Sequence, residues 1–216
     1  MTHSLHREGT LESLENDYVL YVYPAKGFNW KGSIPKVKRL CQIVFEAGPA
    51  NLTLTSQRRN MYSGVTPQEV VDSITEEGVR VFCVFNSREK LKEALRRIKE
   101  ADLGISIVVS GLIDRVREVS LELGIDPHTV NLSAGFHGQT DRLPPADIRE
   151  FTSMCGHGVV SRDLVSDILR KVKTGKISKW EGSIVLARPC ACGIFNPFRA
   201  AELLKEKAPL YTVARW

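Results

Sequence analysis

The sequence predicts an α/β protein: a mostly parallel, three-layer sheet of about five strands with a C-terminal helical subdomain. Two stretches carry this prediction, because residues 81–85 and 105–109 are almost continuously apolar and lack the alternation of a half-exposed sheet. Strands buried on both faces need helices on both faces, which is the usual setting of a parallel sheet. Strand and helix patterns also alternate, with short connections, up to about residue 143.

The expected strands are runs rich in β-branched and aromatic residues. The first is 18–23, which has the sequence Tyr-Val-Leu-Tyr-Val-Tyr and stops at Pro24. The other expected strands are 51–55, 79–85, 105–109 and 129–132. Together they make the sheet of about five strands.

Between these strands, apolar residues recur at helical spacing and the ends carry capping residues. Thr66-Pro67-Gln68-Glu69 is a capping box with proline at the first helical position, and Gly48 is a good C-terminal cap. Helices are expected from about 37 to 47, 67 to 77, 88 to 103 and 113 to 123.

After about Pro144 the pattern becomes helical. Helices are expected over 146–151, after the cap Ser161, over 178–187, and after the cap Asn196, where Pro197 takes the first position. We therefore divide the chain into a polar leader (1–16), an α/β sheet domain (17–143) and a helical, cysteine-containing subdomain (144–216).

Composition narrows the classes of function. The formal net charge of +5 is mild and scattered, which suits a small anionic molecule but not a nucleic acid. The leader has no apolar run of signal-peptide length, and no stretch approaches the roughly 18 apolar residues of a membrane span. We expect a cytoplasmic protein with reduced thiols and no membrane partner, with a homodimer possible.

Two short motifs gather soft metal ligands in the helical part. Cys155-Gly156-His157-Gly158 and Cys190-Ala191-Cys192-Gly193 each precede a predicted helix, whose N-terminus would stabilise thiolates. We predict that Cys155, His157, Cys190 and Cys192 form one site.

The ligand set leaves three interpretations open. The preferred one is a 4Fe-4S iron-sulfur cluster on Cys155, Cys190 and Cys192, with the fourth iron bound by His157 or open to substrate. The same four ligands suit a tetrahedral zinc ion, although zinc knuckles usually space their cysteines by two residues. In the third there is no metal, and Cys155 serves a thiol enzyme as its nucleophile. Cys41 and Cys83 are expected to be core residues.

Loops after the predicted strands supply candidate catalytic residues. His137 is the candidate acid-base group, and Arg58 and Arg59 could clamp a carboxylate or phosphate, although each could equally be an ordinary surface residue. No dinucleotide-binding or P-loop glycine motif occurs.

The combined hypothesis is an iron-sulfur enzyme that acts on a small anionic substrate by lyase, dehydratase or redox chemistry. The alternatives are a zinc-stapled, non-catalytic interaction protein and the metal-free thiol enzyme.

Overall fold

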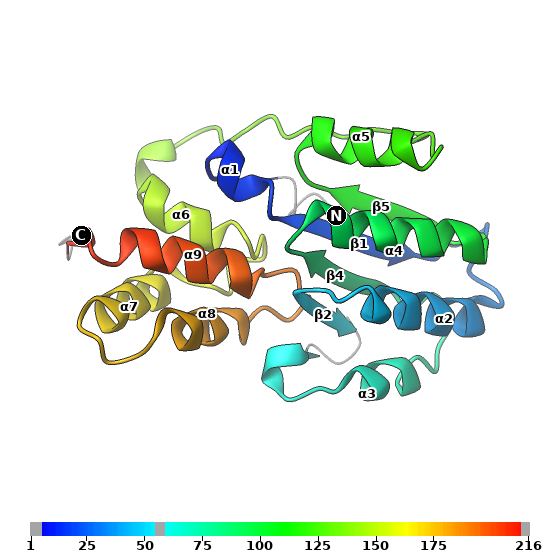
Figure 1. Ribbon diagram of the computed structural model, residues 1–216, viewed down its shortest axis with the longest axis horizontal. Helices are drawn as coiled ribbons and strands as arrows, with labels where there is room; N and C mark the ends of the chain where they lie inside the picture. The colour runs from blue at the N-terminus through cyan, green and yellow to red at the C-terminus, as the bar shows by residue number, and fades with distance from the viewer. Residues whose placement is uncertain (1–5, 55–58, 213–216) are drawn as a thin grey trace.

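The computed structural model describes residues 6–54 and 59–212, and its described strands form one sheet (Figure 1). In their spatial order the strands are Arg59–Asn60 (β3), Asn51–Leu54 (β2), Val81–Phe85 (β4), Tyr18–Tyr23 (β1) and Ser106–Ser110 (β5). Every neighbouring pair of these strands is antiparallel.

The prediction of a mostly parallel sheet is therefore wrong. Helix α2 (Ser33–Glu46) connects β1 to β2, which run in the same direction, but β4 lies between them and is antiparallel to both. Helix α4 (Arg88–Ala101) connects β4 to β5 in the same way, with β1 between them. This split β-α-β connectivity also occurs in ferredoxin-like folds, and a topology by itself indicates no cofactor. The apolar runs report burial on both faces and carry no information on which strand inserts between two others.

A second difference concerns the fifth strand. Residues 129–132 are not a strand, and Val130 and Leu132 are 55% and 73% exposed. The fifth strand is instead the short β3, which lies where a loop was predicted and pairs Asn60 with Thr53 of β2. Strand-forming residues do not make a strand without a neighbouring edge to pair with.

Apolar clusters cover both faces of the sheet, and alternate residues of β1 belong to different clusters. Leu20 and Val22 pack in the cluster formed with α2 to α5, whereas Val19 and Tyr21 pack in the cluster formed with the C-terminal helices. Figure 1 shows α2 and α4 lying over the sheet and α6 to α9 gathered in a separate group on the left. This double coverage explains why the strands lack polar alternation.

The remaining helices lie near their predicted ranges, except that the helix in the polar leader was not predicted and the one that begins at Pro67 ends well before residue 77. They are Leu11–Leu14 (α1), Pro67–Asp72 (α3), Ile113–Glu122 (α5), Ala146–Thr152 (α6), Arg162–Lys173 (α7), Lys179–Ala187 (α8) and Pro197–Lys207 (α9), with 3-10 turns at Met61–Ser63 (η2) and Thr140–Arg142 (η3). Within the described ranges, no helix is both long and apolar enough to cross a membrane.

Close packing of the C-terminal helices depends on Gly182 of α8. A Cβ atom at this position would lie 2.9 Å from Ile168 Cγ2 and 3.1 Å from Leu204 Cδ1. We expect Gly182→Val to lower the free energy of unfolding by about 1–3 kcal/mol, because the extra methyl groups overpack the helix interface. Urea denaturation measures this change.

The matched control is Glu206→Val, which places the same β-branched residue on the exposed side of α9. It should cost less than about 1 kcal/mol, since only helix propensity changes. Equal losses in the two variants would contradict the role given to Gly182.

Candidate metal centre

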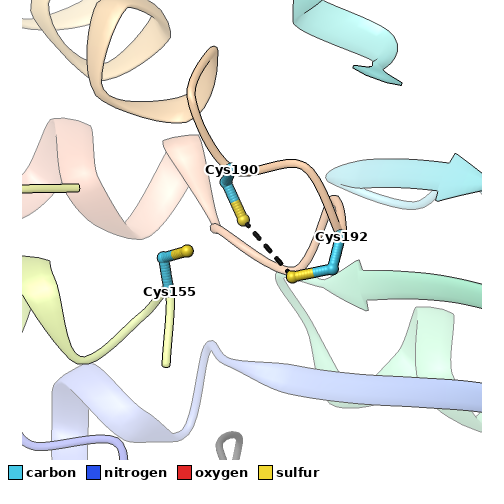
Figure 2. A group of neighbouring side chains, drawn as sticks. All are labelled: Cys155, Cys190 and Cys192. Atoms are coloured by element: carbon cyan, nitrogen blue, oxygen red, sulfur yellow. Dashed lines mark hydrogen bonds between the residues drawn. The ribbon is translucent and has the colours of Figure 1, made fainter. Parts of the chain in front are cut away.

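The structure brings three cysteines together. Cys155 lies on the loop after α6, while Cys190 and Cys192 lie on the loop between α8 and α9, and the three side chains approach one another from two sides (Figure 2). Their Sγ atoms all lie within 4.8 Å of one another, and the Sγ atoms of Cys190 and Cys192 are 3.8 Å apart. A group of this kind could bind a metal ion.

Burial and mutual hydrogen bonding set the charge of this group. Cys155 and Cys190 are fully buried and Cys192 is 5% exposed. Hydrogen bonds with Cys190 and Cys192 lower the pKa of Cys155, so one thiolate is stabilised by two thiols. The same hydrogen bonds, together with burial, raise the pKa of Cys190 and of Cys192. A second or third thiolate therefore needs a cation beside it.

His157 lies at the rim of the cysteine group. Its Nδ1 atom is 3.3 Å from Cys192 Sγ, and the residue is exposed to solvent. It is not among the three residues whose ligand atoms lie mutually within 4.8 Å. Of the four predicted ligands, then, three form a compact group and the fourth touches one of them.

Backbone amides of the same loops reach two of the sulfurs. A hydrogen bond from the His157 N–H lowers the pKa of Cys155, and one from the Ile194 N–H acts on Cys192 in the same direction. We predicted that helix N-termini would supply this stabilisation, but Cys155 and Cys190 each sit just after the last turn of a helix, α6 and α8. Turns within the loops supply N–H groups instead.

Contacts with the sheet hold the loop between α8 and α9. A Cβ atom on Gly193 would lie 2.8 Å from the backbone of Leu52 and Thr53 in β2, and Gly193 has a φ of 62°, so glycine fits both requirements. The buried Asn60 side chain donates to Cys190 O at 2.8 Å, and Thr53 Oγ1 donates to Ala191 O at 3.1 Å. The edge of the sheet thus positions the Cys-x-Cys segment.

Arg7 of the leader connects the two cysteine loops. Its guanidinium donates to Met154 O at 3.1 Å and also to Ile194 O. Met154 directly precedes Cys155, and Ile194 follows Cys192 by two residues. No local sequence pattern predicts this contact, since Arg7 stands in a polar segment without periodicity.

Arg7 belongs to a buried ionic group, which we call the Arg7–Asp17–Arg199 triad. Asp17 accepts from Arg7 and from Arg199 at 2.5 and 2.7 Å, and the side chains are 6%, 0% and 2% exposed in chain order. Burial alone would raise the pKa of Asp17, but the two guanidinium groups outweigh it and hold that pKa below its usual value. Asn196, the cap of α9, donates to Asp17 as well at 3.2 Å.

The predicted catalytic residues are placed differently. Arg58 lies outside the described residues. Arg59 turns its guanidinium to Ser63 O and Gly64 O, and His137 Nε2 contacts Ala134 O at 2.7 Å in an exposed segment. The hydrogen bonds of these two side chains thus stay within their own loops, and their catalytic roles stay predictions.

Comparison with known proteins yields no relative: no family model, no curated protein and no solved structure matches the chain. Function is therefore inferred from the geometry of the cysteine group and its surroundings.

The triad makes a prediction about stability. Asp17→Asn keeps the shape of the side chain but leaves two buried guanidinium groups without a counter-charge, so we expect the free energy of unfolding at pH 7 to fall by about 3–5 kcal/mol. Because the folded-state pKa of Asp17 is lowered, its contribution is complete above the unfolded value near 3.8 and is lost as the pH falls through the folded value. The difference between wild type and variant should therefore be constant down to about pH 4 and shrink below it.

Asp163→Asn is the matched control, because Asp163 is exposed at the start of α7. It should cost less than about 1 kcal/mol in denaturant unfolding. If Asp17→Asn lowers the free energy of unfolding by no more than Asp163→Asn does, the triad contributes little to stability.

Proposed function

We propose that this protein binds one metal ion through Cys155, Cys190 and Cys192, with His157 as the fourth ligand, and that the ion joins the two cysteine loops. The observation that carries the proposal is the mutual approach of three buried sulfur atoms to within 4.8 Å. With thiolate and imidazole ligands, the ion this set fits best is zinc.

Distances between the ligand atoms support a single ion. Four ligands around tetrahedral zinc, with Zn–S near 2.3 Å, have sulfur atoms about 3.8 Å apart and nitrogen about 3.5 Å from sulfur. The separation of the Cys190 and Cys192 sulfurs is 3.8 Å, and His157 Nδ1 is 3.3 Å from Cys192 Sγ. In a cubane cluster each cysteine binds a different iron, which places the sulfurs farther apart than around one ion.

Burial supports a structural role for the ion. Structural zinc sites are closed by protein ligands, whereas catalytic sites keep a position open. The sulfurs here are enclosed. Arg7 bonds both loops, and contacts of Asn60 and Gly193 fix the loop between α8 and α9. An ion bound here would connect α6 to the α8–α9 loop and, through that loop, to β2.

An iron-sulfur cluster on the same three cysteines is the second candidate. It is favoured by the count of three thiols, with the exposed His157 beside them as a fourth ligand. Lyase or redox chemistry on a small anionic substrate would belong to this version, and both remain predictions.

Metal analysis of anaerobically purified protein tests the proposal. We expect about one equivalent of zinc per chain and no acid-labile sulfide, and we expect Cys155→Ser, Cys190→Ser and Cys192→Ser each to lose most of the metal, because each removes one thiolate ligand. Cobalt substitution should give a thiolate-to-metal charge-transfer band in wild type that the three variants lack.

Cys41→Ala is the control, because Cys41 is a buried thiol in the other apolar cluster, among the residues packed with α2. It should keep the full metal content. Iron together with labile sulfide would select the cluster, and protein that binds no metal at all would overturn the proposal.

Removal of the metal should loosen a defined region. With a chelator present, we expect amide exchange to accelerate in the loops 154–160 and 188–196, because the joint between them is lost, while α2 and α4 keep their protection. Hydrogen-exchange mass spectrometry measures both regions in one experiment. Unchanged exchange in the two loops after complete metal removal would exclude the structural role.

A further inference from the structure

We propose that Arg7 is the positioning residue of this metal centre. It holds the two ligand loops together, and its positive charge compensates the net negative charge of a metal ion bound by three thiolates. This inference rests on the proposed function. Its basis is that a single guanidinium bridges carbonyl groups beside ligands from two separate loops.

The bridge acts directly on the ligand geometry. Met154 O, which accepts from Arg7, belongs to the peptide unit that leads into Cys155. Ile194 O also accepts from Arg7, and the N–H of Ile194 is the donor to the Cys192 sulfur. A shift of the guanidinium would therefore move a sulfur on each side of the centre.

The net charges of the triad and of the metal complex also support this role for Arg7. The buried triad contains two guanidinium groups and one carboxylate, which leaves one positive charge without a partner inside it. A divalent ion with three thiolates and a neutral imidazole carries one negative charge. The positive charge of the triad and the negative charge of the metal complex are each costly to bury alone. When they lie close together, their attraction offsets part of that cost.

The same side chain has an unmet donor. Arg7 Nε is buried and has no hydrogen-bond partner among the described residues. A buried N–H of this kind is costly, and an anionic neighbour lowers that cost. The leader thus carries a guanidinium that hydrogen-bonds to both ligand loops.

The test compares metal release from wild type, Arg7→Met and Arg7→Lys, each loaded with zinc and mixed with excess chromophoric chelator. Arg7→Met should bind zinc about 10–100-fold more weakly, the usual effect of losing an outer-shell partner, and Arg7→Lys should lie between it and wild type. Cobalt-loaded Arg7→Met should also show a displaced thiolate charge-transfer band, which a loss of global stability alone would not produce.

Arg149→Met is the matched control. Arg149 also fixes the leader, through Glu8 at 2.9 Å, but its described side-chain bonds do not reach the cysteine loops. It should bind zinc with wild-type affinity. Equal weakening in Arg149→Met and Arg7→Met would indicate general loosening of the leader and overturn the inference.

The remaining outcomes are also decisive. A folded Arg7→Met protein with wild-type affinity and cobalt spectrum overturns the role of Arg7 and leaves the metal site standing. If Arg7→Met does not fold, then wild-type zinc affinity in folded Arg7→Lys overturns the role of Arg7. Wild type that binds no metal contradicts the proposed function, and this inference with it.

Discussion

The architecture around the cysteines depends on one buried carboxylate. Asp17 immediately precedes β1, an inner strand of the sheet, and it binds one guanidinium from the leader and one from α9. Through Arg7 it also reaches the carbonyl groups of both cysteine loops. Buried ion pairs add little net stability but penalise every alternative that separates the partners. Here they select one placement of the leader, the sheet and the last helix relative to one another.

Within that frame, the cysteine loops are positioned by backbone contacts. The side chain of Asn60 donates to three carbonyl groups at the C-terminal end of α8 and just after it, those of Ala187, Arg188 and Cys190. Gly193 lies against the backbone of β2. A buried side-chain amide that donates to main-chain carbonyl groups restricts the backbone conformation of the loop it contacts. The edge of the antiparallel sheet therefore positions the loop that carries Cys190 and Cys192.

The sequence predicted the members of the cysteine group but not what surrounds it. Cys155, Cys190 and Cys192 stand out because soft ligands beside glycines in breaks between helices have a local chemical meaning. The direction of neighbouring strands has none, since insertion of β4 between β1 and β2 is decided by tertiary packing. Arg7 was missed for the same reason: an arginine in a polar leader becomes informative only when partners 147 and 187 residues away are known.

These separations also order the events of biosynthesis. Arg7 and β1 leave the ribosome early, yet the carbonyl of Ile194 and the guanidinium of Arg199 emerge only after nearly every other element has been made. Until then Cys155 has no second thiol beside it, and Asp17 has at most one of its two cations. Non-local contacts of this kind form late in folding. Completion of the centre thus requires that the leader, the start of β1, both cysteine loops and α9 have reached their native arrangement.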